Sequence, residues 1–235
     1  MNTRISPAVL AANADEFRSQ IERVSPFAVR LHIDLADGVF APSKTIPIDQ
    51  VWWPGGVRAD LHVMYQKPFE HAKLLLGLRP QLIIVHAEAE GDFVAFAEAA
   101  HAQGVEVGVA LKHATSPELL RPALQWIDHV LVFSGNIGHF GGQADVNLLS
   151  KVTQLRALKP QLEIGWDGGV NGQNARVLAQ GDVDVLNVGG YIQHAADPAG
   201  VYHSLERAVS TSAQNPAPAR VAQSPGQQPA RRRFI

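Results

Sequence analysis

Short apolar runs alternate with amphipathic segments along most of the chain. Residues 82–85 are all apolar, which is typical of a parallel strand buried on both faces. Other segments repeat their apolar residues with the period of a helix, as Phe17, Ile21 and Val24 do at i, i+4 and i+7. We expect strands over residues 5–10, 29–34, 58–64, 81–86, 105–111, 129–133, 162–166 and 183–188. Helices are expected between them, with clear signals after Asn13, at 68–78, near 93–100, at 116–124, from 148, at 172–180 and at 199–209.

This strict alternation predicts the fold class. Alternating strands and helices give a parallel sheet, and eight such units in 235 residues favour a closed (β/α)8 TIM barrel over an open doubly wound sheet. The chain is 46% hydrophobic, which is enough for one substantial core. We therefore predict a single α/β barrel domain over residues 1–212. In such barrels, catalytic residues lie at the carboxyl ends of the strands.

Composition narrows the classes of protein that are possible. The chain has no cysteine, so disulfides and thiolate metal sites are excluded. No apolar run is long enough to span a bilayer, and no signal-like segment follows Met1, so we expect a cytoplasmic protein without a membrane partner.

The last residues differ in composition from the rest of the chain. Residues 213–235 hold four arginines, four prolines and no acid, among Ala, Gln and Ser, so we expect a disordered and solvated tail. The remaining chain has 16 basic and 22 acidic residues, a net charge of -6, and this argues against a nucleic-acid partner.

A histidine and an aspartate near the end of the second predicted strand are the first candidates for metal ligands. Because side chains alternate faces along a strand, His32 and Asp34 point the same way. Taken alone, such a pair is more often a structural hydrogen-bonded pair than a metal site. His62 and Asp167, at the ends of two further strands, complete a set of two imidazoles and two carboxylates. This set suits one divalent transition ion such as zinc, manganese or ferrous iron.

Three glycine clusters follow the last predicted strands, at residues 138–142, 168–169 and 189–190. In barrels, the loops after the last strands commonly bind phosphate through backbone N–H groups, which glycine lets approach closely. Turn glycines are common, but the joint position of these clusters near Asp167 favours a phosphorylated substrate.

Two carboxylates beside a metal suggest proton transfer next to a carbonyl group. A metal bound to a ketose carbonyl and the neighbouring hydroxyl acts as a Lewis acid on the enediolate that forms when the proton leaves. If Asp34 and Asp167 face opposite sides of the substrate, one removes the proton and the other supplies one to the opposite face. The outcome is epimerisation.

The order of these motifs resembles the ribulose-phosphate 3-epimerase family over about residues 4–210. The resemblance rests on these segments: Ile5-Ser6-Pro7; His32-x-Asp34-x-x-Asp37-Gly38-x-Phe40-x-Pro42; Asp60-x-His62-x-Met64; Val85-His86-Ala87-Glu88-Ala89; Phe140-Gly141-Gly142-Gln143; and Asp167-Gly168-Gly169-Val170. It implies His32, Asp34, His62 and Asp167 as metal ligands, with Asp34 and Asp167 as the acid/base pair. The substrate positions implied are Ser6, Met64, Gly141, Gly142, Gly168, Gly169, Gly189 and Gly190.

Several residues depart from the pattern of that family. Ala8 stands where serine is usual, Ala36 and Phe133 stand where methionine is usual, and Ser43 replaces asparagine. The loop at 135–139 is one residue longer, Gly190 replaces a phosphate-binding serine, and Trp166 is bulky beside Asp167. These departures leave the metal set intact and alter the wall and lid of the pocket.

Five other polar residues have less direct interpretations. His139 is either a phosphate contact or, more in keeping with its loop position, an exposed histidine. We expect Asp37 to brace the turn after the second strand, and His86 and Glu88 to have a structural or pocket-edge role. A Schiff-base role for a lysine, Lys112, is not needed beside a metal set.

The leading hypothesis is a metal-dependent 3-epimerase that converts D-ribulose 5-phosphate to D-xylulose 5-phosphate. One alternative is a 3-epimerase of a six-carbon ketose phosphate such as allulose 6-phosphate, because Ala8 and Ala36 would enlarge the pocket. Another is a non-catalytic barrel that binds a sugar phosphate or a protein partner, suggested by the altered phosphate loop. The family resemblance also leads us to expect a homo-oligomer.

Overall fold

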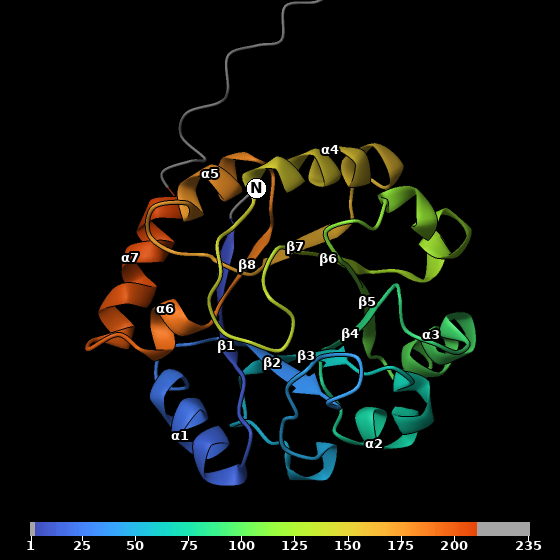
Figure 1. Cartoon of the computed structure of the whole chain (residues 1–235), viewed down its shortest axis with the longest axis horizontal. Helices are drawn as coiled ribbons and strands as arrows, with labels where there is room; N and C mark the ends of the chain where they lie inside the picture. The colour runs from blue at the N-terminus through green and yellow to red at the C-terminus, as the bar shows by residue number, and fades with distance from the viewer. Residues whose placement is uncertain (1–2, 211–235) are drawn as a thin grey trace, which may run out of the picture.

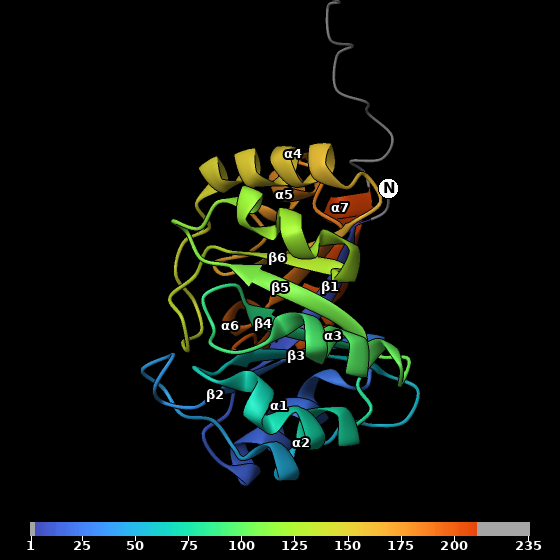
Figure 2. The same ribbon diagram turned by 90° about the vertical axis from the view of Figure 1, so that its right-hand side faces the viewer.

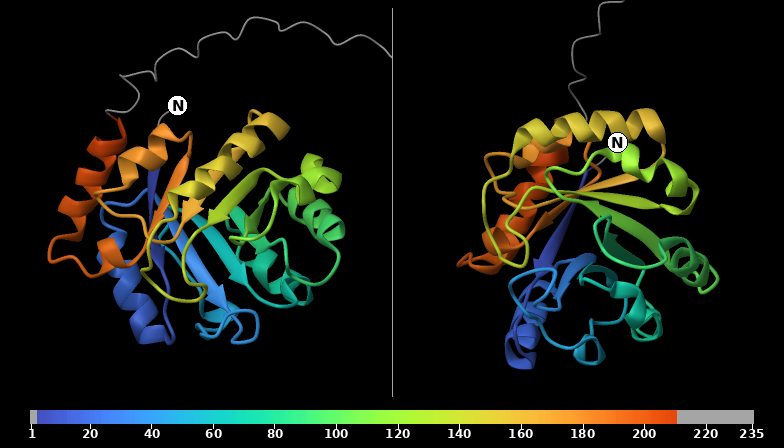
Figure 3. Two further views of the ribbon diagram at one scale, coloured as in Figure 1. Left: turned by 45° about the horizontal axis from the view of Figure 1, so that its top comes forward. Right: turned by 45° about the vertical axis from the view of Figure 1, so that its right-hand side comes forward.

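The structure, a computed structural model, describes residues 3–210 (Figure 1). In this part of the chain, eight parallel strands close into a barrel in sequence order, which confirms the predicted (β/α)8 barrel. The strands run in a common direction at the centre of both views in Figure 3. They are β1 (Arg4–Val9), β2 (Arg30–Ala36), β3 (Arg58–Met64), β4 (Leu82–His86), β5 (Glu106–Leu111), β6 (His129–Phe133), β7 (Glu163–Asp167) and β8 (Val185–Val188).

Helices surround the barrel, with α1 and α2 on one side of the strands and α4 and α5 on the opposite side in Figure 2. The helices are α1 (Ala14–Val24), α2 (Ala72–Gly77), α3 (Phe93–His101), α4 (Leu149–Leu158), α5 (Ala175–Gln180), α6 (Gly190–Gln193) and α7 (Pro198–Ser210). Short 3-10 helices occupy Ile48–Gln50, Pro68–His71, Pro117–Trp126 and Val146–Leu148. Asn13 caps α1 by accepting a hydrogen bond from the Glu16 backbone N–H, as its position before the periodic segment predicts.

Two elements differ from the sequence-based expectation. The segment after β5 is a 3-10 helix over Pro117–Trp126 and not an α-helix. Pro122 lies inside it, and a proline cannot donate the backbone hydrogen bond that an α-helix needs there. The one-turn helix α6 directly after β8 was not predicted, because four residues are too few to show a helical period.

Side chains of the strands divide between two cores. Outward-facing residues such as Leu31, Ile33 and Val188 pack under the helices in the main hydrophobic cluster. The inward-facing apolar residues Leu82, Ile84, Ala110 and Leu131 form a separate small cluster inside the barrel. The barrel is thus filled with side chains, and polar residues are concentrated at its two ends.

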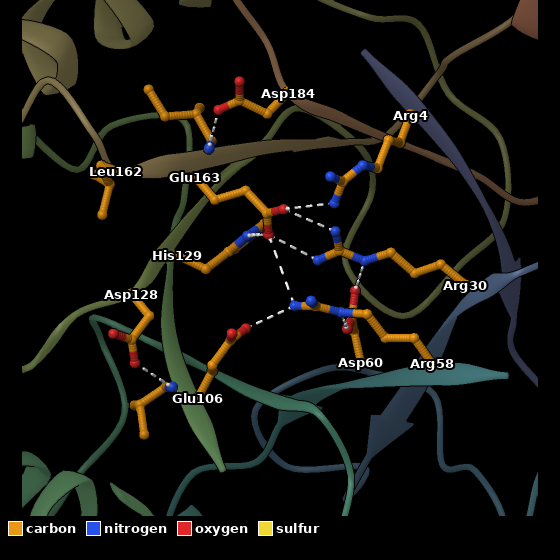
Figure 4. A network of polar contacts seen from close by, with 12 residues as sticks. Arg4, Arg30, Arg58, Asp60, Glu106, Asp128, His129, Leu162, Glu163 and Asp184 are labelled. Carbon is orange, nitrogen blue, oxygen red and sulfur yellow. Dashed lines mark hydrogen bonds and ion pairs between the residues drawn. The ribbon is translucent and has the colours of Figure 1, made fainter. Parts of the chain in front are cut away.

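A network of charged residues closes the amino-terminal end of the barrel (Figure 4). It includes the first residues of six strands: Arg4, Arg30, Arg58, Glu106, His129 and Glu163. Arg30 is buried and donates to both carboxylate oxygens of Glu163 at 2.8 and 2.9 Å, and it also pairs with Asp60. His129 Nδ1 lies 2.8 Å from Glu163 Oε2. Because the network is at the opposite end from the candidate ligands, we assign it a structural role.

The predicted disordered tail over residues 213–235 lies outside the described residues. Among the helices within 3–210, none has the length and apolar character needed to cross a membrane.

Candidate metal and catalytic centre

The two imidazoles and two carboxylates singled out in the sequence lie together at the carboxyl ends of β2, β3 and β7. One ligand atom from each of His32, Asp34, His62 and Asp167 lies within 4.8 Å of the other three. His62 Nδ1 is 2.8 Å from Asp34 Oδ1, and His32 Nε2 is 3.3 Å from both His62 Nδ1 and Asp34 Oδ1. Asp167 Oδ2 is 3.6 Å from His32 Nε2 and from His62 Nδ1. Residues far apart in the sequence thus converge on one point.

These four atoms fit one divalent metal ion. A tetrahedral site with bonds of about 2.0–2.2 Å places its ligand atoms about 3.3–3.6 Å apart. The separations in the cluster run from 2.8 to 3.6 Å, so small movements would bring them to that geometry. His32 Nδ1 is buried and has no hydrogen-bond partner in the described part of the chain, so Nε2 is the nitrogen that belongs to the cluster. The donor set can therefore hold a transition ion.

Electrostatics within the cluster favour an ionised carboxylate at Asp34 and a protonated imidazole at His32. Burial alone would raise the pKa of Asp34, but the charge of His32 and hydrogen bonds from His32 and His62 outweigh it and hold that pKa well below its usual range. Burial lowers the pKa of His32, yet Asp34 and Asp167 together raise it to about 10. Because a metal binds neutral imidazole, occupying this site must release the proton of His32.

A second layer of polar residues orients His62. His86, the last residue of β4, places its Nε2 2.9 Å from His62 Nε2. Burial lowers the pKa of His86 to about 4, so its imidazole is neutral at pH 7 and can accept the proton of His62 Nε2. His86 Nδ1 lies 3.4 Å from Glu88 Oε2, and Glu88 accepts hydrogen bonds from Thr115 Oγ1 and the Lys112 backbone N–H.

The sequence placed His86 and Glu88 at the pocket edge or in a structural role, and the structure brings His86 against a candidate ligand. The signal that could have identified it is its position at the carboxyl end of β4, since His62 also lies near the end of its strand. Hydrogen bonds to the outer nitrogen of a ligating histidine select its tautomer and increase its basicity. His86 is therefore a positioning residue for His62.

A cavity of about 350 Å³ opens over the cluster. Asp34, Asp167, Ala8, Met64 and Phe133 are among the side chains that line it. All six glycines expected at the phosphate side also line it: Gly141, Gly142, Gly168, Gly169, Gly189 and Gly190. Ser6 lies below, fully buried in β1 and outside the lining.

Glycine is required where the loops after β6 and β7 meet. Gly168 has φ +104° and Gly169 has φ +71°, conformations that favour glycine. A Cβ on Gly168 would collide with the backbone of Gly135, and one on Gly169 would collide with the backbone of Gln143 and Ala144. The close approach of these backbones forms the glycine-rich wall of the cavity.

The structure also shows where the unusual residues lie. Trp166 is fully buried and points away from Asp167 into the core under the helices, where its Nε1 donates to the Gly168 carbonyl at 3.2 Å. Ala36 packs with Met64 and the loop residue Ile137 and does not line the cavity. The bulk of Trp166 therefore supports the loop at Gly168 and takes no space from the site.

Three further residues have defined surroundings. Asp37 accepts backbone hydrogen bonds from Val39, Phe40 and Gln66, which confirms that it braces the turn after β2. Lys112 places its Nζ 3.8 Å from the centre of the Phe40 ring. His139 is exposed and lines the cavity from the loop after β6.

The fold and the ligand cluster together are those of a barrel enzyme with a candidate site at the carboxyl ends of its strands. Residues 4–193 match the model of the ribulose-phosphate 3-epimerase family, and the chain belongs to that family. It is thus a carbohydrate epimerase, an isomerase, and the non-catalytic barrel considered above is not supported.

Three relatives named ribulose-phosphate 3-epimerase match this chain over more than nine-tenths of their own length. The chain is 32% identical to ribulose-phosphate 3-epimerase of Helicobacter pylori over 202 residues, which cover 83% of this chain and 92% of the relative. It is 30% identical to that of Mycobacterium leprae, with 88% and 95% covered, and 28% identical to that of Schizosaccharomyces pombe, with 89% and 95% covered.

Solved structures support the fold. 3-Hexulose-6-phosphate synthase from Salmonella typhimurium superposes with a TM-score of 0.68 at 17% identity, over 89% of this chain and all of that chain. 3-Keto-L-gulonate-6-phosphate decarboxylase from Vibrio cholerae also gives a TM-score of 0.68, at 12% identity, over 90% and 99% of the two chains. At these identities the likeness concerns the barrel alone.

Proposed function

We propose that this protein interconverts D-ribulose 5-phosphate and D-xylulose 5-phosphate with the help of one divalent transition ion, zinc, manganese or ferrous iron. The observation that carries the proposal is the position of Asp34 and Asp167. Both line the cavity and both belong to the ligand cluster, yet β2 and β7 are separated in the barrel by β1 and β8. The two carboxylates therefore reach a bound substrate from different sides.

Proton transfer at C3 of the ketose is the step that these residues would perform. Asp34, whose pKa is held below its usual range, is ionised at neutral pH and can take the C3 proton of one epimer. Asp167, which must enter this direction in its protonated form, would then deliver that proton to the opposite face of the same carbon and be left as carboxylate. In the other direction the two residues exchange these roles. When bound, the metal ion would supply Lewis-acid stabilisation for the negative charge that develops on the substrate oxygens.

The glycine wall supports a phosphorylated substrate. Gly141, Gly168 and Gly189 come from three successive loops after β6, β7 and β8, and all of them line the cavity. Backbone N–H groups in such loops bind phosphate without a cationic side chain. With the phosphate held there, the carbon chain would extend from the loops towards the carboxylates.

Proton NMR in deuterated water tests the proposal. We expect metal-loaded protein to remove the C3 hydrogen signal of D-ribulose 5-phosphate and to produce the xylulose form. Loss of the signal without inversion would show that only one carboxylate acts. No exchange with any of the three metals would contradict the proposed reaction.

A second candidate substrate is a six-carbon ketose phosphate such as allulose 6-phosphate. Ala8 lines the cavity and has no side chain beyond Cβ, which leaves room for a longer carbon chain. Comparing kcat/KM for the five- and six-carbon ketose phosphates separates the two. A clear preference for the longer substrate would replace the first assignment.

Two further expectations are part of the same proposal. We propose association into a homo-oligomer, which light scattering combined with gel filtration tests. We also propose a cytoplasmic location, which fractionation of the native cells tests.

A further inference from the structure

Asn187 lies on the floor of the cavity, and its amide has no hydrogen-bond partner within residues 3–210. It belongs to β8, whose neighbouring residues Leu186 and Val188 face outward into the main core. Asn187 faces inward, is 2% exposed and lines the cavity. Its Oδ1 is buried without a hydrogen bond, and its side chain forms none with any of residues 3–210.

An unpartnered amide at this place needs an explanation. Buried polar side chains in native proteins are nearly always satisfied by protein, by ordered water or by a ligand. An apolar residue would fill the barrel interior without this cost, as Leu82, Ile84 and Leu131 do on other strands. Asn187 opens onto the cavity, so a bound molecule can complete its hydrogen bonds.

The position of Asn187 relative to the acid/base pair limits where a ligand group that contacts its amide can lie. On one side, Asn187 is in register with Asp167 of β7. On the other side, it is in register with Ser6 of β1, two residues before the small cavity residue Ala8. A group that contacts the Asn187 amide therefore lies beside the carboxylate of Asp167 and at the level of the barrel interior, below the glycine loops.

We propose that Asn187 is a specificity-determining residue that hydrogen-bonds a substrate hydroxyl outside the reacting C2–C3 unit, at C1 or C4 of the ketose. This inference rests on the proposed function. A carboxamide both donates and accepts, so it can satisfy a hydroxyl in both of its roles. The phosphate is assigned to the glycine wall and the oxygens on C2 and C3 to the metal cluster, which leaves these two hydroxyls for Asn187. The same bond would hold C3 against Asp167.

Deoxy analogues test this assignment. We would measure kcat/KM of the metal-loaded wild type and of Asn187→Leu with D-xylulose 5-phosphate, 1-deoxy-D-xylulose 5-phosphate and 4-deoxypentulose 5-phosphate. We expect the kcat/KM of the wild type to be about 10- to 100-fold lower for one analogue than for the full substrate, because the missing hydroxyl leaves the Asn187 amide without a partner. Asn187→Leu should lose a similar factor on the full substrate and should treat that analogue and the full substrate alike. The analogue affected identifies the hydroxyl.

Two further variants keep the test decisive. Asn187→Ser retains a polar group of shorter reach, and it replaces Asn187→Leu if the latter does not fold. Gln103→Leu is the control, because Gln103 is an exposed amide in the loop before β5 and does not line the cavity. Its discrimination ratios should equal those of the wild type.

The result that overturns the inference is an Asn187 variant that folds and keeps both wild-type ratios. Failure of the proposed function is distinct from this, because the wild type would then not exchange the C3 hydrogen of D-xylulose 5-phosphate at all. The inference is also wrong if the wild type exchanges that hydrogen and its kcat/KM is the same for both deoxy analogues and for the full substrate, because the hydroxyl contact is then absent.

Discussion

His62 Nε2 and His86 Nε2 lie 2.9 Å apart, and this contact decides which nitrogen of His62 faces the candidate metal site. The neutral His86 can accept the proton on Nε2 of His62. Nδ1, which hydrogen-bonds Asp34 Oδ1 at 2.8 Å, is then the nitrogen that would bind a metal ion after it releases its proton. Replacing His86 by Leu removes the acceptor. We expect His86→Leu to weaken zinc binding by about 10- to 100-fold, measured by competition with a chromogenic chelator.

Two comparison variants define that experiment. His86→Gln keeps an acceptor and should recover part of the affinity. His203→Leu changes an exposed histidine of α7, paired with Glu206, and should bind zinc as the wild type does. Wild-type affinity in His86→Leu would show that His62 does not depend on His86.

The acid/base pair predicts a specific pattern of isotope exchange. Asp34→Asn and Asp167→Asn keep the shape of the side chain and one ligand oxygen, and each should lower kcat by about 10²- to 10⁴-fold. Each variant retains one carboxylate, so we expect it to exchange the C3 hydrogen of one epimer without inverting it. NMR in deuterated water measures this, with the metal content of each variant determined in parallel. Epimerisation at the wild-type rate in either variant would refute the two-carboxylate assignment.

Glu163 is expected to stabilise the amino-terminal end of the barrel. Its side chain is mostly buried and accepts from Arg30 and His129, so Glu163→Gln leaves Arg30 with a weakened partner. We expect the free energy of unfolding at pH 7, measured with urea, to fall by roughly 1–3 kcal/mol, because Arg30 keeps its pair with Asp60. Glu118→Gln, which changes an exposed pair with Arg121, should have no measurable effect.

The stabilisation by Glu163, measured as the difference between the wild type and Glu163→Gln, should depend on pH. Burial would raise the pKa of Glu163, but hydrogen bonds from Arg30 and His129 outweigh it and hold the pKa well below 4.5, its ordinary value. The folded state thus binds this proton less readily than the unfolded state, and the stabilisation is complete above pH 4.5 and lost as the pH falls further. The difference in unfolding free energy between wild type and Glu163→Gln should shrink below pH 4.5. A constant difference down to pH 3 would contradict this.

Replacing Gly168 is expected to reduce both the stability of the fold and the binding of the substrate. An alanine there requires an unfavourable φ and collides with the backbone of Gly135, so the loops after β6 and β7 must separate. We expect Gly168→Ala to cost about 1–3 kcal/mol of stability and to raise KM for the phosphorylated substrate. Gly77→Ala is the control: no atom lies within 4 Å of the added Cβ, and stability should stay equal or rise. Unchanged KM in Gly168→Ala would separate this wall from phosphate binding.

Much of the site was predictable because the direction of a side chain on a strand follows from its position in the sequence. Side chains alternate faces with a period of two, so the ends of β2, β3 and β7 could be located and their His and Asp residues assigned to one end of the barrel. The 3-10 helix Pro117–Trp126 was less accessible, because its start resembles that of an α-helix and only Pro122 interrupts it.

Other features depend on contacts across the barrel and could not be read locally. Alternation along β7 places Trp166 on the face opposite Asp167, but only the structure shows that its Nε1 donates to the Gly168 carbonyl and supports that loop. The amide of Asn187 has meaning only beside Asp167 and Ser6, which lie on two different strands.

The sequence by itself determined the order of the elements, the inward or outward face of each strand residue and the chemical types of the four candidate ligands, because these follow from short-range periodicity and composition. Only the tertiary structure decided which atoms meet. Closure of the barrel and the register of its strands set the contact of His62 with His86 and the convergence of Arg30, Asp60 and Glu163 at the opposite end. Such contacts join residues from strands that are distant in the sequence, so no local pattern contains them.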